Sequence, residues 1–161
     1  MKISAIEEYG IRCMLLLARR NADETLTLPE FELREGLSIP YAAKLLMILK
    51  RAGLVKAARG RKGGYMLARA PEQIPLKEIL DALGEPVFSS SHCGRHSGQL
   101  DICVHHDDCQ VRVIWKSFDN FISQILTGIT LADVASGNLD FLQNAQITTG
   151  NGKENNISLE R

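Results

Sequence analysis

The sequence predicts a mainly α-helical protein with one small β-hairpin and a long helix near its C-terminal end. Three observations predict this fold class. Apolar residues recur at helical spacing in the N-terminal part and again after Cys109. Ser or Thr followed three residues later by Glu, a pattern that starts helices, precedes the first two helical segments. A glycine- and arginine-rich segment, 59–64, separates two short segments with strand character.

Length and composition indicate one main core and a local basic surface. The chain has 161 residues, enough to bury a core as one compact domain with an appended element. The formal net charge is zero, so no global attraction to nucleic acid or membrane is expected. The segment 44–69, however, contains eight Lys or Arg residues and no Asp or Glu. This distribution predicts a basic patch.

The N-terminal residues lack the pattern of a secretory signal, because Glu7, Glu8 and Arg12 interrupt the apolar segment. No run of about 18 apolar residues is present, so no membrane partner is expected. We therefore expect a cytoplasmic protein. Cysteines in that reducing compartment are more often metal ligands or redox groups than disulfides.

The first helix is expected to begin after Ser4 and to run to about Arg20. Ser4 and Glu7 form a capping box, in which each side chain bonds the other residue's backbone. Cys13 falls on the apolar stripe of this helix, so we expect a core thiol rather than a ligand. Glu7 is used by the cap, whereas Glu8 is free to point elsewhere.

The next two helices are expected to form a helix-turn-helix. Thr27 and Glu30 make a second capping box, and the short helix that follows stops near Gly36. Ser38 can cap a third helix over 39–52. Two helices joined by a tight glycine-containing turn are typical of this motif. The polar N-terminal end of the second helix is the end that meets base edges in such proteins.

A basic hairpin follows. The segments 54–58 and 65–67 are the expected strands, and Arg59, Arg61 and Lys62 lie on the glycine frame between them. A helix-turn-helix followed by such a hairpin is the winged-helix pattern, in which the hairpin reaches a phosphate or a minor groove. A phosphate-binding enzyme loop is discounted, because such loops lead into a helix N-terminus. A plain solvated hairpin remains an alternative.

The C-terminal part is expected to form a fourth helix from Ile74 to Leu83, a long helix to about Thr127 with Asp107 or Asp108 as its cap, and a short helix that ends at Gly137. The apolar face of the long helix is too broad to cover only a small domain, so a two-fold homodimer is expected. A core helix packed within its own domain is the alternative. The residues of this face are Val111, Trp115, Phe118, Ile122, Ile125 and Ile129.

These elements divide the chain into four parts. We expect a winged helix-turn-helix DNA-binding domain over 1–86 and a cysteine- and histidine-rich loop over 87–110. A dimerisation helix with a short following helix is expected over 107–137. Residues 138–161 form a polar tail that cannot bury enough apolar surface to order itself.

The loop from His92 to Cys109 contains nearly every soft metal ligand of the chain. It holds three of the four cysteines and all four histidines, namely Cys93, Cys103, Cys109, His92, His96, His105 and His106. On spacing alone, these residues suit a tetrahedral zinc site, which is slightly favoured, or an iron–sulfur cluster. A cysteine nucleophile with a histidine base, a thiol redox switch and a loop with chance cysteines remain open. Nothing in the sequence favours an enzyme.

Residues 1–137 resemble the family of winged-helix regulators that bind iron–sulfur clusters, the IscR, NsrR and RirA type. Two stretches carry the resemblance. One is Leu45 to Leu67, with Ile48-Leu49-Lys50-Arg51-Ala52-Gly53-Leu54-Val55 and then Arg59-Gly60-Arg61-Lys62-Gly63-Gly64-Tyr65. The other is the trio Cys93, Cys103 and Cys109 before a long apolar helix.

The resemblance implies a homodimeric transcription regulator that binds a pseudo-palindromic operator on double-stranded DNA under control of a cluster. The three cysteines would hold the cluster, with a two-iron two-sulfide form favoured over a four-iron four-sulfide form and zinc as the alternative. The signal would be iron, cluster supply, oxidants or nitric oxide. The residues expected at DNA are Ser38, Pro40, Tyr41, Lys44, Lys50, Arg51, Arg59, Arg61 and Lys62.

Two departures from the family concern the ligands. Nine residues separate Cys93 from Cys103, where the family usually has five. One branch uses a histidine three residues after its third cysteine, but Arg112 occupies that position here and cannot ligate a metal. Another branch recruits an acidic residue from the first helix of the second subunit, and Glu8 is the matching residue. The expected fourth ligand is therefore Glu8 or one of the loop histidines, with His106 and His96 first among these.

Overall fold

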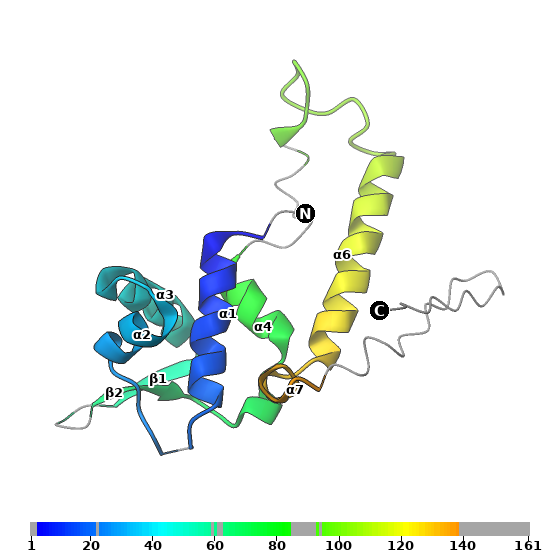
Figure 1. Ribbon diagram of the computed structural model, residues 1–161. Helices are drawn as coiled ribbons and strands as arrows, with labels where there is room; N and C mark the ends of the chain where they lie inside the picture. Colours follow the sequence, from blue (N-terminus) through cyan, green and yellow to red (C-terminus); the bar gives the residue numbers. More distant parts are fainter. Residues whose placement is uncertain are drawn as a thin grey trace, which may run out of the picture.

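The computed structural model describes residues 3–21, 23–58, 60, 63–84, 93 and 95–138. It confirms a mainly helical chain with one antiparallel hairpin (Figure 1). The elements, in chain order, are α1 (Ala5–Ala18), α2 (Leu28–Glu35), α3 (Ile39–Arg51), β1 (Val55–Ala58), β2 (Gly64–Leu67), the 3-10 helix η1 (Pro71–Gln73), α4 (Leu76–Leu83), α6 (Gln110–Gly128) and α7 (Leu131–Ser136).

Both expected N-terminal capping boxes are confirmed. Ser4 N donates to Glu7 Oε2 over 2.7 Å, and Glu7 N donates to Ser4 Oγ over 3.3 Å. At α2, the backbone N–H and the hydroxyl of Thr27 donate to Glu30 Oε2 over 2.8 and 2.9 Å. These bonds lower the pKa of Glu30 below its ordinary value, the one from the Thr27 backbone most of all. These local side-chain pairs therefore determine the residues at which α1 and α2 begin.

The helix-turn-helix is confirmed. Gly36 ends α2 with φ of 65°, a left-handed conformation that favours glycine, and the buried Leu37 follows it. Ser38 then occupies the N-cap position of α3, as expected, but its hydroxyl makes no capping hydrogen bond. Helix α3 ends at Arg51, and Gly53, with φ of 73°, turns the chain into β1.

The wing is a two-stranded sheet tied to the body of the domain. Strand β1 pairs with β2 from Val55 opposite Leu67 to Ala58 opposite Gly64. Tyr65 also pairs with Leu26, whose N–H and carbonyl exchange 2.8 Å bonds with the backbone of Tyr65. The segment before α2 therefore fixes where the wing stands relative to the helix-turn-helix.

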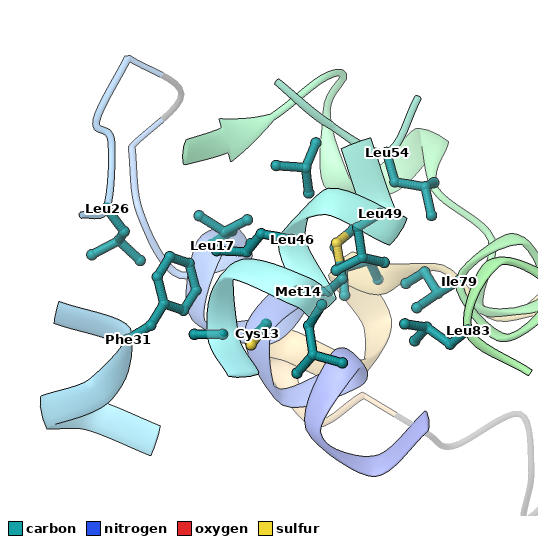
Figure 2. Packing of buried hydrophobic residues seen from close by; sticks show 14 of the residues in the cluster. Cys13, Met14, Leu17, Leu26, Phe31, Leu46, Leu49, Leu54, Ile79 and Leu83 are labelled. Carbon is teal, nitrogen blue, oxygen red and sulfur yellow. The ribbon is translucent and has the colours of Figure 1, made fainter. Parts of the chain in front are cut away.

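The core lies between α1, α2, α3, α4 and α7 (Figure 2). Cys13 and Met14 point from α1 into it, and Phe31 closes it from α2. Ile79 and Leu83 contribute from α4. This packing positions α3 with one face buried and the other exposed, as a helix that reads DNA requires.

Two expected boundaries in the C-terminal part are wrong. Helix α4 begins at Leu76 rather than Ile74, because Ile74 precedes a proline and instead bonds through its carbonyl to Leu131 N over 2.8 Å. Helix α6 is capped by Cys109 rather than by Asp107 or Asp108, since Cys109 Sγ accepts the N–H of Arg112 over 3.3 Å.

Helix α6 contacts α4 but has no buried residue along its 19 positions. It leads into α7, which has a capping box between Thr130 and Asp133 and ends at Gly137 as expected. Among the described residues, no helix is long and apolar enough to cross a membrane. The expected tail at 138–161 lies, from residue 139 on, outside the described residues.

Candidate nucleic-acid interface and ligand loop

The N-terminal end of α3 presents the residues expected to read DNA. Ser38, Pro40 and Lys44 are exposed. Tyr41 is half-buried and packs against the core, where its ring meets that of Tyr9 edge to face, with centroids 6.0 Å apart. The first two turns of α3 therefore combine an exposed hydroxyl and an exposed ammonium group with an aromatic anchor.

The other expected DNA residues fall into two groups. Lys50 and Arg51 are exposed in the last turn of α3. Arg59, Arg61 and Lys62 lie outside the described residues. The hairpin turn itself is closed by a 2.8 Å bond from the N–H of one glycine, Gly63, to the carbonyl of another, Gly60.

The helix-turn-helix has a further contact that the sequence analysis missed. Arg12 Nε donates to Glu35 Oε2 over 2.8 Å, and a terminal guanidinium nitrogen donates to the backbone carbonyl of Glu35 over 3.2 Å. The hydrogen bond to Glu35 raises the pKa of Arg12. The guanidinium carbon also lies 5.2 Å from the centroid of the Tyr9 ring. In the sequence Arg12 is only a charge that interrupts an apolar segment, because its partner is 23 positions away.

The ligand loop lies at the N-terminal end of α6, at the far end of the molecule from the β-hairpin (Figure 1). His96 N donates to the carbonyl of Cys93 over 3.2 Å, and His106 N donates to that of Cys103 over 3.0 Å. Cys93 and Cys103 therefore each begin a tight turn whose fourth residue is a histidine. The Nδ1 atom of His106 is 3.0 Å from a carboxylate oxygen of Asp107.

Arg112 ties this loop to α6. Its guanidinium donates to the backbone carbonyls of His105 and His106, while its own N–H reaches the sulfur of Cys109. The Nε atom of Arg112 is buried and has no hydrogen-bond partner in the described part of the chain. Arg112 is thus a structural anchor of the loop.

The cysteines have two kinds of environment. Cys93, Cys103 and Cys109 are free thiols of intermediate burial, whereas Cys13 is fully buried in the core. Burial raises the pKa of the Cys13 thiol to about 12. The expectation that Cys13 is a core thiol is confirmed.

The expected ligands are not gathered in this structure. Among the residues that the structure describes, no three Cys, His, Asp or Glu side chains come close enough together to hold a metal ion. Glu8 is exposed on α1, and its charge is one of the smaller causes that raise the pKa of Arg12. His92 lies outside the described residues, while His96, His105 and His106 are exposed.

Comparisons with known proteins agree on one class. A family profile described as "Rrf2: Iron-dependent Transcriptional regulator" matches residues 3–137. The transcriptional regulator IscR of Sodalis glossinidius is 31% identical over 136 residues, which are 84% of this chain and 79% of that protein.

Two solved structures are similar over most of the chain. CymR of B. subtilis, described as the global cysteine regulator, has a TM-score of 0.68 and 28% identity, and the match covers 86% of this chain and 98% of CymR. IscR of T. potens has a TM-score of 0.65 and 31% identity, with 93% and 94% covered. The similar proteins whose functions are stated are regulators of transcription, not enzymes.

Proposed function

Since the chain belongs to the Rrf2 family of iron-dependent transcriptional regulators, we propose that it is a homodimer whose operator binding is controlled by an iron–sulfur cluster on Cys93, Cys103 and Cys109. DNA binding and transcription regulation follow from the family itself. Cluster control and the homodimer are the proposed parts.

The observation that carries the proposal is the placement of the thiols. Three free, half-buried cysteines share one loop at the start of the longest helix, and the fourth cysteine is inside the core. Cysteines that share one loop commonly hold a metal group or act as a redox pair, and three of them suit an iron–sulfur cluster.

The donor set fits such a cluster. Thiolates are its usual ligands, and a histidine can replace a thiolate. Cys109 is the N-cap of α6, and the N–H of Arg112 is directed at its sulfur over 3.3 Å.

The fourth ligand is proposed to be Glu8 of the second subunit or a loop histidine. Glu8 is exposed, and the end of α1 that carries it faces the same end of the molecule as the loop (Figure 1). His106 is favoured among the histidines, because the Asp107 carboxylate beside Nδ1 can orient the ring and leave Nε2 for a metal.

Arg112 and helix α6 provide a route by which a change in this loop can alter DNA binding. When bound, the cluster supplies a group that responds to oxidants, nitric oxide or iron supply. Arg112 joins the loop to the first turn of α6, so a change in the loop reaches that helix. If α6 pairs with its copy, as proposed, movement there changes the spacing of the two α3 helices and hence the affinity for two operator half-sites.

Anaerobic purification tests the proposal. The protein is expected to be brown or red, with visible absorption bands and with iron and acid-labile sulfide in equal amounts. The Cys103→Ala variant should lose both, whereas Cys13→Ala should keep them. A colourless protein with neither iron nor sulfide after anaerobic purification and reconstitution would contradict the proposal.

The alternative function rests on the same three free thiols. It is a winged-helix regulator with a thiol-based, metal-free redox switch, or one with a structural zinc site. Zinc without sulfide in the parent protein identifies the zinc form. A metal-free parent whose DNA binding changes on mild thiol oxidation identifies the switch.

A further inference from the structure

Helix α1 contacts the helix-turn-helix on both sides of its turn. Helix α1 supplies Arg12 to the end of α2 and Tyr9 to the beginning of α3. These two residues bracket the segment 36–38, which joins α2 to α3. The same two residues contact each other, because the Arg12 guanidinium lies over the Tyr9 ring.

The contact with α2 fixes both the position and the direction of its last turn. The carbonyl of Glu35 is among the last four of the helix, which have no partner inside it. Arg12 satisfies this carbonyl and the carboxylate of the same residue. The side chain of Glu35 is only 13% exposed, so the pair is partly shielded from water. A planar guanidinium with two bonds tolerates little rotation of the group it holds.

The contact with α3 acts on the turn that meets DNA. Tyr41 is in the first turn of α3, and its ring packs at 87° to that of Tyr9. The buried face of α3, with Ala42, Leu45 and Leu49, fixes how deep this helix lies in the core. The edge-to-face ring pair adds a second contact to this apolar packing, at the first turn of the helix.

We infer that Arg12 is a positioning residue for DNA recognition, which through Glu35 and Tyr9 sets the direction of the N-terminal end of α3 without touching DNA itself. Base recognition needs side chains placed within about 0.5 Å and 10–20°. A small rotation of α3 therefore weakens specific binding while the fold persists. The inference rests on DNA binding, which the family establishes, and not on the cluster.

The test compares specific with non-specific binding. The parent protein selects a duplex from a random DNA library, and a scrambled duplex of the same length serves as the non-specific probe. Arg12→Gln is expected to lower affinity for the selected duplex about tenfold and to leave affinity for the scrambled duplex unchanged. The slope of log affinity against log salt should stay at the parent value, because no phosphate contact is lost.

The variants come with matched controls. Arg19→Gln makes the same chemical change at an exposed position of the same stretch of chain, just after α1, and should leave both affinities unchanged. Glu35→Gln removes the charge-assisted bond but leaves the backbone carbonyl that accepts from Arg12, so it should reproduce part of the loss, and the double variant should be no weaker than Arg12→Gln alone. Arg12→Lys keeps the positive charge but lacks the planar guanidinium group with its several donors. Its affinity for the selected duplex should therefore lie between those of Arg12→Gln and the parent.

Three results would overturn the inference. A salt slope that falls by about one would mean that Arg12 contacts a phosphate directly. Affinity for the selected duplex within about twofold of the parent, in a variant with native near-ultraviolet circular dichroism, would remove any role in recognition. Loss of the folded state in Arg12→Gln, Arg12→Lys and Glu35→Gln alike would show a purely structural residue.

Discussion

Four cysteines of identical chemistry divide according to their surroundings. Cys13 is enclosed by apolar side chains from α1, α2 and α3, which penalise a charged thiolate and raise the pKa to about 12. Cys109 instead receives a backbone N–H at a helix start, and Cys93 and Cys103 lie on the open loop. Since thiolate is both the nucleophile and the ligand, environment separates one inert thiol from three usable ones.

This difference predicts a thiol titration. The metal-free protein, fully reduced and folded, should react rapidly with an aromatic disulfide reagent at three thiols. The fourth should react only after unfolding, and should stay slow at pH values well below about 12. The Cys13→Ala variant should keep three fast thiols and lose the slow one. Four fast thiols in the folded parent would show that the core around Cys13 opens readily.

At the scale of elements, the wing is held by a backbone contact that leaves no room for a side chain. A Cβ at Gly64 would lie 2.6 Å from the carbonyl oxygen of Leu26. Neither group can move away cheaply, because Tyr65 exchanges two backbone bonds with Leu26. The glycine therefore allows the strand to lie against the segment before α2.

Gly64→Ala is expected to destabilise the protein by about 1–3 kcal/mol, the usual cost of overpacking. Chemical denaturation measures the free energy of unfolding. Gly128→Ala is the matched control, since a Cβ there meets nothing within 4 Å, and it should be neutral or slightly stabilising. An unchanged free energy in Gly64→Ala would mean that the wing shifts freely relative to Leu26.

The elements also show what local sequence could predict. The starts of α1, α2 and α7 follow from pairs three residues apart, such as Thr130 and Asp133, because a capping box is made within one turn. The wing followed from glycines and cations between two short apolar segments. Such signals need no knowledge of the rest of the chain.

Features that depend on tertiary contacts could not be predicted. The pairing of Arg12 with Glu35 joins residues 23 positions apart. The sequence favours an aspartate as the cap of α6 because Asp is the commoner cap, yet the Cys109 sulfur accepts that bond. The carboxylates of Asp107 and Asp108 instead contact His106 and Gln110. The spacing of the loop ligands did not predict how near to one another they lie.

At the scale of the whole molecule, α6 connects the loop that holds three cysteines with the DNA-binding domain. The ligand loop is at its N-terminal end, while its C-terminal end reaches the domain that carries α3 and the wing (Figure 1). Between them, α6 exposes large apolar side chains, with Val111 58%, Trp115 42%, Phe118 52% and Phe121 42% exposed. An apolar face of this extent on one helix is typical of an interaction surface.

The proposed homodimer would bury this apolar face of α6, so a charge placed on the face should weaken the dimer. Burying a large apolar side chain contributes about 1.5–3 kcal/mol, and two-fold symmetry counts each position twice. Phe118→Glu should therefore raise the dimer dissociation constant at least about a hundredfold. Analytical ultracentrifugation measures this. Asn120→Glu introduces the same carboxylate about 200° around the helix and serves as the control.

The same variant connects assembly to DNA binding. A monomer can occupy only one half-site, so Phe118→Glu should bind the selected duplex with about half the parent's salt slope and should bind a single half-site as well as the whole. Asn120→Glu should retain the parent's slope. If Phe118→Glu instead stays dimeric, α6 packs through another face, and the route from the loop to the spacing of the two α3 helices cannot pass through Phe118.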